Sequence, residues 1–563
     1  MKRIIALLVA LVFVLSAFAG CTQKTGDKDE TTPGETTTPG ETTNPGETTN
    51  PGETTDPGET TPDDPSFVPA FTADTWISAG SVKVKGEDVR PKNAVTNTTV
   101  YLAKNEKEAF NISIRSGSAY EGLKIVVVSG NNNQIAVEYF DLHLVAAGNN
   151  TYPDGMVPYN GSFNVEANVT KTIMVRFATT SSTKSGTYAY TFEIQTADGK
   201  TVQRFTAEVT VWNFALPEVY TSVGTVNIDK PSIQYGEGIP GAQITTYYRE
   251  YYEILLEYGL AGQTIPYDIL NSKADEYLDD PRIKAFVVPW DVTDEKLTQY
   301  YEKLSQKQEW LDKAYFYVYE EPVNVAHLEK IKERCERLQR LCPQIKICVT
   351  FFRNVRVDGS TDTIDTLAKY VDIWSPKTAC WTNGWMADPV KNGYFGDRMD
   401  AEVRGGDNVW WYVSWEPGDP YCNLYVNEDG INHVELFWQQ YLYGSEGMLY
   451  WCANYWSETE DPWTDIATVK SVWLTCYGDG SLLYPGSKVN VKGPIASFRL
   501  ECIRSGMEDY DLLLKAENLF GRTWVLEQVN KITSSMTVHT DDVALYTSVR
   551  IAIGNAIEAE LNH

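Results

Sequence analysis

The chain of 563 residues has little of what metal-binding domains need. Its five histidines are scattered, and its nine cysteines form no Cys-x-x-Cys pair. Structural zinc sites usually show such closely spaced ligand pairs, so we expect no metal site and no cofactor. Eight cysteines lie between Cys335 and Cys502, mostly in apolar segments. This placement favours buried free thiols, although an extracellular location would permit disulfides.

Basic residues are also scarce. The chain has 48 Lys and Arg against 76 Asp and Glu, which gives a formal net charge of −28. Proteins that bind nucleic acids present a clustered basic surface to the phosphates, and no segment of this chain carries a basic stripe. The composition therefore argues against nucleic acid as a partner. Nothing in the sequence predicts an oligomeric state.

The apolar run near the N-terminus is too short for a stable membrane span. The segment IIALLVALVFVLSAFA follows Lys2 and Arg3, and this order of charge and apolar residues predicts a signal peptide over residues 1–20. The segment ends in FAGC, which resembles the lipobox of bacterial lipoproteins and implies lipid attachment at Cys21. We therefore expect a lipid-anchored protein on the outer face of a bacterial cell membrane. Ordinary signal cleavage beside an incidental cysteine is the alternative.

Residues 21–65 form a repetitive segment with units such as TTPGE and TTNPGE. The repeats contain no apolar side chains to bury, so they predict a disordered tether. Regularly spaced prolines and like charges favour an extended chain that reaches about 100 Å from the membrane.

Residues 66–217 alternate short apolar and polar patterns with turns rich in Gly, Asn and Asp. The segment FEIQTADGKTVQRF places Asp-Gly between two alternating stretches, which is typical of a β-hairpin. Strands at this spacing without intervening helices predict a β-sandwich. The segment offers no cysteine and no buried pair of acids. We interpret it as a structural or glycan-contacting domain.

After residue 217, strand-like segments alternate with helical ones. We expect eight strands, around residues 221–229, 263–269, 283–290, 313–321, 345–352, 371–376, 408–415 and 447–456. This alternation predicts a (β/α)₈ barrel, known as a TIM barrel, over residues 218–493. An open doubly wound sheet is the alternative, but no Gly-rich phosphate loop follows the first strand. Residues 494–563 contain two long helical segments and are expected to form a helical extension on the barrel flank.

The segment AYFYVYEEPVN places Glu320 and Glu321 together at the C-terminal end of the fourth expected strand, where barrels gather their functional residues. Glycoside hydrolysis needs one carboxylic acid to protonate the leaving oxygen and a second group to stabilise the developing positive charge. Adjacent strand residues point to opposite faces, so the pair can share a substrate only if the strand breaks there. We expect Pro322 to break it. Alternatively, the pair only stabilises the start of the next helix.

Tryptophan is concentrated in one part of the sequence. Eleven of the sixteen tryptophans lie between Trp374 and Trp473, several of them at the ends of expected strands. Aromatic faces stack on the apolar C–H surface of sugar rings, so this concentration favours a glycan ligand. Any one of these side chains is as readily part of the core.

Several segments resemble, in order, the catalytic region of glycoside hydrolase family 123. They are YFYVYEEP, VDIWSP, NVWWYVSW, ELFWQQYLYGSEGMLYWCANYW with DPW, GDGSLLYPG and SFRLECIRSGMEDYDLL. The β-rich segment before them resembles the N-terminal domain of that family. The resemblance implies an exo-acting β-N-acetylgalactosaminidase that removes terminal β-linked N-acetylhexosamine. It also implies a retaining mechanism in which the 2-acetamido oxygen of the substrate attacks the anomeric carbon.

By this resemblance, Glu321 is the acid/base, and Glu320 stands where the family has an aspartate that orients the acetamido group. The extra methylene of Glu320 moves the carboxylate by about 1.5 Å. Misplacement near 1 Å costs about 10²-fold in rate. The expected substrate-binding pocket walls are Trp374, Tyr412, Trp451 and Trp456.

A second mechanism rests on Glu416, which follows the seventh expected strand. An acid/base after strand four and a nucleophile after strand seven is the layout of many retaining barrel glycosidases. Glu416 would then be a covalent nucleophile about 5 Å from the acid and would act on a different sugar. Alternatively, Glu416 is an ordinary loop carboxylate. A third interpretation is a non-catalytic surface lipoprotein that binds glycans.

Overall fold

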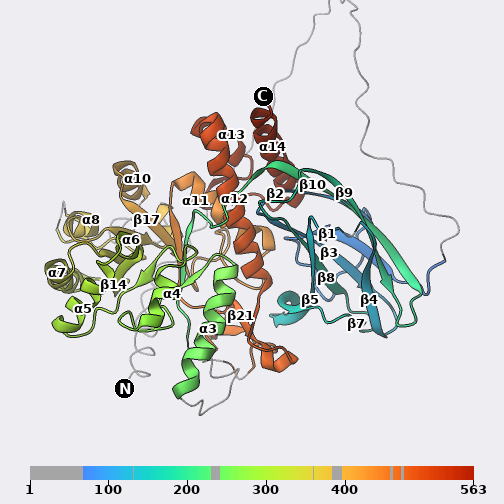
Figure 1. The fold of residues 1–563 in the computed structure, drawn as a ribbon, viewed down its shortest axis with the longest axis horizontal. Helices are drawn as coiled ribbons and strands as arrows, with labels where there is room; N and C mark the ends of the chain where they lie inside the picture. Colours follow the sequence, from blue (N-terminus) through green and yellow to red (C-terminus); the bar gives the residue numbers. More distant parts are fainter. Residues whose placement is uncertain are drawn as a thin grey trace, which may run out of the picture. The chain divides into compact units, whose positions relative to one another are not determined.

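The computed structural model describes residues 68–130, 132–229, 241–358, 361–382, 396–456, 459, 461–470 and 475–563 (Figure 1). These residues belong to one unit, Val68–His563. The predicted signal peptide, the tether and Cys21 lie outside the described residues. No helix in the described part of the chain is both long and apolar enough to span a membrane.

The N-terminal part of this unit consists of ten β-strands in two five-stranded sheets, in the orders β1-β3-β8-β5-β6 and β2-β10-β9-β4-β7. In β10, every second residue from Phe205 to Val211 is buried, as the alternating pattern predicts. Apolar side chains from both sheets share one core. The strands are β1 (Asp74–Ala79), β2 (Asn97–Lys104), β3 (Lys107–Arg115), β4 (Tyr120–Ser129), β5 (Ala136–Ala147), β6 (Asn150–Pro158), β7 (Phe163–Val165), β8 (Lys171–Ala178), β9 (Gly186–Gln195) and β10 (Thr201–Ala215).

A sheet of eight parallel strands follows and closes into a nearly complete barrel. Its spatial order is β12-β11-β18-β17-β16-β15-β14-β13. The two ends of this order meet where the N–H of Val287 donates to the carbonyl oxygen of Gln263 at 2.7 Å. The strands are β11 (Val223–Val226), β12 (Ala261–Gly262), β13 (Phe286–Val287), β14 (Ala314–Glu320), β15 (Lys346–Phe351), β16 (Ile373–Pro376), β17 (Asn408–Val413) and β18 (Gly447–Tyr450).

The predicted position of the second barrel strand is wrong. We expected residues 263–269, but β12 comprises Ala261–Gly262 and the expected segment follows it as turns. Pro266 lies within that segment and has no N–H for continued pairing. At Gly262, an added Cβ would lie 2.6 Å from the ring of Tyr252, so the barrel needs a glycine where β-propensity alone predicts no strand.

Alternate strand residues separate the barrel interior from the layer between strands and helices. Tyr315, Cys348 and Trp410 belong to a cluster inside the barrel. The residues next to them in the strands, such as Phe316 and Val349, belong to the larger core that the helices cover. This two-residue period decides which strand-end residues face the substrate side.

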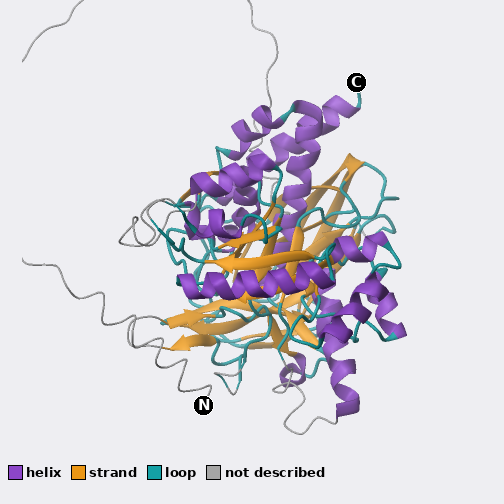
Figure 2. Cartoon of the chain, turned by 90° about the vertical axis from the view of Figure 1, so that its left-hand side faces the viewer, coloured by secondary structure: helices purple, strands orange, loops and turns teal. Residues whose placement is uncertain are grey.

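Helices connect most of the barrel strands, and three of them begin at residues whose side chains cap the helix. Thr293 caps α5 and Asn324 caps α7, while Asp362 and Asp365 form a capping box at α8. Figure 2 shows helices in front of and beside the orange strands. The helices are α3 (Gly241–Glu257), α4 (Asp275–Leu278), α5 (Asp294–Leu304), α6 (Gln308–Lys313), α7 (Val325–Leu341), α8 (Thr363–Leu367), α10 (Gly396–Gly405) and α11 (Gly430–Tyr443).

The C-terminal part of the chain is mainly helical and interrupted by short hairpins. The long helix α12 packs along α11 and contacts β6, and Figure 1 shows it between the barrel and the two N-terminal sheets. The elements after the barrel strands are β19 (Ala467–Lys470), β20 (Thr475–Tyr477), β21 (Leu483–Pro485), β22 (Pro494–Ala496), α12 (Phe498–Phe520), α13 (Arg522–Val529), β23 (Thr533–Ser535), β24 (Val538–His539) and α14 (Val543–Leu561).

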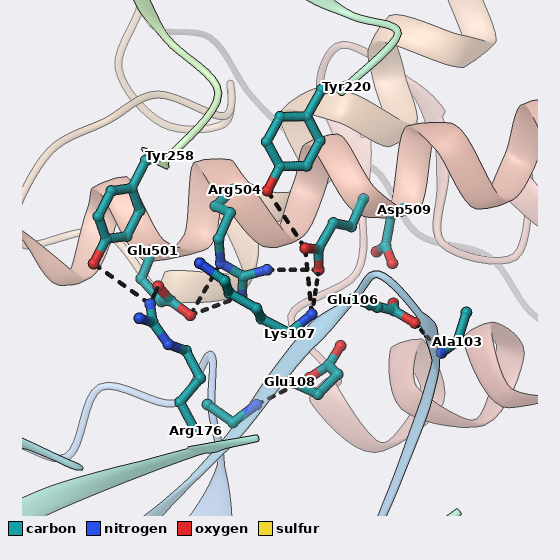
Figure 3. A network of polar contacts seen from close by, with 12 residues as sticks. Ala103, Glu106, Lys107, Glu108, Arg176, Tyr220, Tyr258, Glu501, Arg504 and Asp509 are labelled. Atoms are coloured by element: carbon teal, nitrogen blue, oxygen red, sulfur yellow. Dashed lines mark hydrogen bonds and ion pairs between the residues drawn. The ribbon is translucent and has the colours of Figure 1, made fainter. Parts of the chain in front are cut away.

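The segment SFRLECIRSGMEDYDLL begins α12 and supplies a buried ionic network (Figure 3). Arg504 contacts Glu501 at 2.7 Å and Glu508 at 2.5 Å. Glu501 also contacts Arg176 of β8 at 2.6 Å. Burial alone would raise the pKa of Glu501, but Arg176 and Arg504 lower that pKa to about 2. The conspicuous charges of this segment therefore join the N-terminal sheets to helix α12.

A second buried pair makes this junction testable. Arg499 of α12 contacts Asp154 of β6 at 2.8 Å, and both side chains are 0% exposed. Replacing Arg499 with methionine should lower the free energy of unfolding by about 3–5 kcal/mol, because Asp154 is left as an unpaired buried charge. Urea denaturation would measure the loss. The control is Arg340→Met, which removes an exposed contact with Asp294 and should cost under about 1 kcal/mol. Equal losses in the two variants would contradict the prediction.

Candidate active site

In the fourth barrel strand, β14, the alternation of inward-facing and outward-facing residues shifts by one residue just before the two glutamates. Tyr315 and Tyr317 face the barrel interior. The register against β15 then shifts between Tyr317 and Tyr319, which leaves Val318 as an extra residue in the strand. Tyr319 faces outward, where the guanidinium of Arg334 lies 5.1 Å from its ring centre. By the two-residue period, this bulge returns Glu320 to the interior side.

The backbone of Glu321 turns its carboxylate to the same side as Glu320. Glu321 has φ of 49°, the left-handed region that residues other than glycine rarely occupy. Its N–H still donates to the carbonyl oxygen of Thr350 at 3.2 Å, so the strand end remains attached to β15. The predicted strand break is present, but the bulge at Val318 and the left-handed Glu321 contribute to it as well as Pro322.

Two side chains from neighbouring strand ends contact the carboxylate of Glu321. The hydroxyl of Tyr412, on β17, donates a hydrogen bond to Oε1. The Nζ atom of Lys377, directly after β16, lies 3.6 Å from the same oxygen, and the Lys377 side chain is 3% exposed. Burial, followed by the charge of Glu321, raises the pKa of Tyr412 well above its usual value. The tyrosine hydroxyl therefore stays protonated and remains a donor to Glu321.

Glu320 has a different environment from its neighbour. Burial raises its pKa, the negative charge of Glu321 raises it further, and Lys377 opposes both effects. Within the described residues, no hydrogen-bond donor contacts the Glu320 carboxylate. Burial and the neighbouring negative charge thus favour a proton on Glu320, whereas the contacts with Tyr412 and Lys377 are made by Glu321.

Glu416 lies at the same end of the barrel. Burial raises its pKa, Lys377 lowers it, and the charge of Glu321 raises it again. These interactions bring the alternative nucleophile into electrostatic range of the pair. The backbone carbonyl oxygen of Glu416 accepts a hydrogen bond from the N–H of Ser414 at 3.2 Å, which fixes the start of the loop after β17.

Comparison with known proteins agrees with this carboxylate site. The sequence model of the glycoside hydrolase family 123 catalytic domain matches residues 249–515, a range that includes Glu320, Glu321, Lys377, Tyr412 and Glu416. Residues 249–515 therefore make up a catalytic domain of glycoside hydrolase family 123. A non-catalytic glycan-binding protein is therefore the weaker interpretation. Among curated proteins, none matches the chain.

Solved structures extend the fold comparison of this family 123 enzyme to most of the chain. A family 123 glycoside hydrolase from Clostridium perfringens has a TM-score of 0.63 at 16% identity, covering 87% of this chain and 98% of that one. At this identity the likeness shows the fold. An FMN-binding β-glucuronidase from Facaelibacterium prausnitzii has a TM-score of 0.28 at 9% identity, covering 74% of this chain and 60% of that one. A TM-score this low does not indicate a shared fold.

Two of the predicted pocket walls of the family 123 enzyme are core residues. Trp374 is 0% exposed and belongs to the layer between strands and helices, because its position in β16 faces outward. Its indole N–H donates to Asp407 at 3.2 Å. Trp456 is 3% exposed and packs edge-on against Tyr251 of α3. Sequence similarity located both tryptophans in the right segments but could not tell which face of the strand or loop each one occupies.

The other two predicted walls are better placed. Tyr412 contacts Glu321, as described above. Trp451 is only partly buried, and its indole N–H donates to Asp479 at 2.9 Å. Gly480 has φ of 71°, and an added Cβ there would lie 2.1 Å from the Trp451 ring. Glycine at position 480 therefore permits the ring position that Asp479 fixes.

Sequence reasoning missed two residues of the site, Lys377 and Asp479, and left Trp415, a tryptophan at an expected strand end, out of the expected pocket walls. Lys377 directly follows the expected sixth strand, so the strand-end rule that found Glu321 could also have found it. Burial raises the pKa of Asp479 to about 6, against the hydrogen bonds from Trp451 and Tyr450 and the charge of Lys377. Trp415 is 46% exposed beside Glu416, and an exposed tryptophan at a barrel rim is a candidate surface for sugar stacking.

Removing Lys377 should change the pH dependence of the enzyme. Lys377 lowers the pKa of both Glu320 and Glu416, so Lys377→Met should raise both pKa values. If catalysis needs either carboxylate ionised, the acidic limb of the kcat/KM profile moves to higher pH. The ratio of activity at pH 7 to activity at pH 5 should increase about 3–10-fold. Lys369→Met is the control, and an unmoved acidic limb in Lys377→Met would contradict the prediction.

Proposed function

We propose that the chain removes terminal β-linked N-acetylhexosamine, with N-acetylgalactosamine as the preferred sugar, by a substrate-assisted retaining mechanism. The observation that carries the proposal is the bulge and left-handed turn that bring two adjacent glutamates to one side of β14. A paired carboxylate of this kind suits an intramolecular nucleophile, because one group handles the proton and the other the acetamido group.

In the first step, Glu321 gives a proton to the glycosidic oxygen as the bond to the anomeric carbon breaks. The acetamido oxygen of the substrate attacks that carbon and forms a cyclic oxazolinium ion. Glu320, in its ionised form, accepts a hydrogen bond from the acetamido N–H and stabilises the positive charge. Water then opens the ring while Glu321 takes its proton, which restores the starting configuration and the protonated acid. Tyr412 and Lys377 stabilise Glu321 in the ionised state between the steps.

A screen of aryl glycosides tests this specificity. The expected order of kcat/KM is β-N-acetylgalactosaminide first, then β-N-acetylglucosaminide, with β-galactoside and β-glucoside at least about 10²-fold lower, because these lack the nucleophile. Proton NMR of the first-formed product should show retention. Equal rates on galactoside and N-acetylgalactosaminide would remove the acetamido group from the mechanism.

The alternative mechanism has Glu416 as a covalent nucleophile acting on a sugar without an acetamido group. The observation in its favour is that Glu416 is half-buried and shares electrostatic interactions with Lys377 and Glu321. The same screen distinguishes the two mechanisms, since a covalent carboxylate nucleophile does not need the 2-acetamido group.

The N-terminal sheets are interpreted as a β-sandwich that supports the active-site loop. Lys83, in the loop after β1, is buried and donates to the carbonyl oxygens of Val426 at 2.9 Å and Glu428 at 2.7 Å. These residues end the loop that begins with Glu416. The C-terminal helices are interpreted as an extension packed on the barrel, with α12 along α11. This assignment gives the sandwich a structural function.

The N-terminal sequence supports a lipid anchor at Cys21, with the folded unit displayed on the outer face of the membrane at the end of the tether. Cys21→Ser should release the processed protein into the medium, because a stable anchor requires the acyl chains. Its kcat and KM should equal those of the parent, since residue 21 is not one of the proposed catalytic or substrate-binding residues. Cell fractionation and assays of both fractions measure this. A processed Cys21→Ser protein that stays with the membrane would contradict the anchor.

A further inference from the structure

Three side chains of types that can bind a metal ion lie together at the loop between β17 and α11. Cys422 lies in the loop itself, Glu435 on α11 and His539 on β24. One thiol sulfur, one carboxylate oxygen and one imidazole nitrogen from these residues all lie within 4.8 Å of one another. Cys422 and Glu435 are buried, and the His539 side chain is 14% exposed. None of these groups takes part in the glycosidase mechanism.

The orientation of His539 indicates a cation between it and Glu435. The Nε2 atom lies 3.1 Å from the carbonyl oxygen of Pro420, which can only accept, so Nε2 carries a proton. In a neutral ring, Nδ1 then presents its lone pair to Oε2 of Glu435, 2.9 Å away. Two lone pairs at that distance repel unless a proton or a metal ion lies between them. Histidine ligands of metals usually donate their second N–H to a carbonyl or carboxylate, as His539 does here.

Cys422 favours a metal ion over a shared proton. Its sulfur lies 3.9 Å from the same Oε2 atom of Glu435, and the side-chain amide of Gln439 lies 3.6 Å from the sulfur as a donor. With a proton shared by Glu435 and His539, the Cys422 thiol makes only this long hydrogen bond to the carboxylate, whereas a thiolate completes a set of metal ligands. Neighbouring ligand atoms on a tetrahedral zinc ion are about 3.4 Å apart, as bond lengths near 2.0–2.3 Å require. The two distances from Oε2 lie on either side of that value.

We propose that Cys422, Glu435 and His539 bind one Zn²⁺ ion, with a water molecule as the fourth ligand. Sulfur, imidazole nitrogen and a single carboxylate oxygen form a donor set that suits zinc better than magnesium or calcium. The ion is structural, because it joins the β23–β24 hairpin to the loop that carries Trp415 and Glu416. This proposal differs from the sequence-based expectation of a chain without metal.

The first experiment measures metal on the tag-free, full-length protein. Protein purified with zinc in the growth medium should contain one equivalent of zinc by mass spectrometry. Removal with a chelator should lower Tm by at least about 3 °C, and added Zn²⁺ should restore it. Replacement by Co²⁺ should produce the charge-transfer absorption of a cobalt–thiolate bond. If the purified protein contained no zinc and neither the chelator nor Zn²⁺ changed its Tm, the proposal would be overturned in favour of a proton shared by Glu435 and His539.

The second experiment identifies the ligands. Cys422→Ser and His539→Gln should each lose the zinc equivalent, and Cys422→Ser should also lose the cobalt–thiolate absorption. Cys335→Ser is the matched control, because Cys335 is equally buried but lies on α7. It should lose stability through the buried hydroxyl but keep its zinc and the absorption band. Retained zinc in Cys422→Ser, or equal zinc loss in Cys335→Ser, would place the ion elsewhere and overturn the assignment.

Discussion

Replacing Glu321 with glutamine should lower kcat on a natural N-acetylgalactosaminide by about 10²–10⁴-fold, the usual contribution of a general acid. Glutamine keeps the shape of the side chain and an oxygen for the Tyr412 hydroxyl, so the fold and KM should change little. An aryl glycoside with a good leaving group needs less protonation and should lose much less activity. Steady-state kinetics on both substrates would measure the two losses side by side.

The control for this variant is Glu329→Gln, on the exposed side of α7, where a surface contact with Lys332 is lost. It should match the parent on both substrates. If Glu321→Gln lost the same factor on both substrates, Glu321 would not be the acid. If Glu320→Gln instead showed the dependence on leaving group, the raised pKa of Glu320 would mark that residue as the acid, with Glu321 as the charged partner.

Replacing Glu320 with glutamine should be as damaging, but with a different substrate dependence. Ionised Glu320 stabilises the oxazolinium ion, so its loss should lower kcat by about 10²–10³-fold on natural and activated substrates alike. A thiazoline analogue of the cyclic intermediate should inhibit the parent enzyme strongly. Its affinity for Glu320→Gln should fall along with kcat. Glu416→Gln should keep most of its activity and its affinity for the inhibitor.

The opposite pattern would assign the reaction to Glu416. A 2-fluoro sugar would then label Glu416, and a peptide digest would locate the label by mass spectrometry. Glu416→Gln would lose activity, and the thiazoline would not inhibit. This outcome would leave the family assignment intact and would replace both the mechanism and the proposed sugar.

The sequence predicts the barrel well where strands are buried on both faces and rich in β-branched and aromatic residues. β14 and β15 lie where AYFYVYE and KICVTF predict them. The prediction fails at β12, a strand of two residues chosen by close packing around Gly262. Short strands of this kind depend on tertiary contacts and leave almost no local pattern. The described cysteines are all buried and form no disulfides, as predicted, although Cys422 is now proposed as a zinc ligand.

The site was only partly predictable, because its geometry depends on which way each side chain points and on where the alternation along a strand is interrupted. The position of Glu321 at a strand end follows from pattern alone. The bulge at Val318 and the left-handed backbone of Glu321 cannot be read from the pattern. Trp374 was wrongly assigned to the pocket for a related reason, because a motif does not show which way a side chain points. The proposed zinc ligands escaped the search for spaced pairs because His539 lies 104 residues beyond Glu435 in the sequence.

The left-handed backbone of Glu321 has a consequence for anyone who engineers this enzyme. A residue other than glycine with that conformation raises the energy of the folded chain by about 1–3 kcal/mol. Glycine, and to a lesser degree asparagine, would relieve this strain without disturbing β14. A selection for thermostability alone would therefore favour substitutions at position 321, and the most heat-resistant variants would be inactive. Directed evolution of this barrel should keep residue 321 out of its libraries or screen every round for hydrolysis.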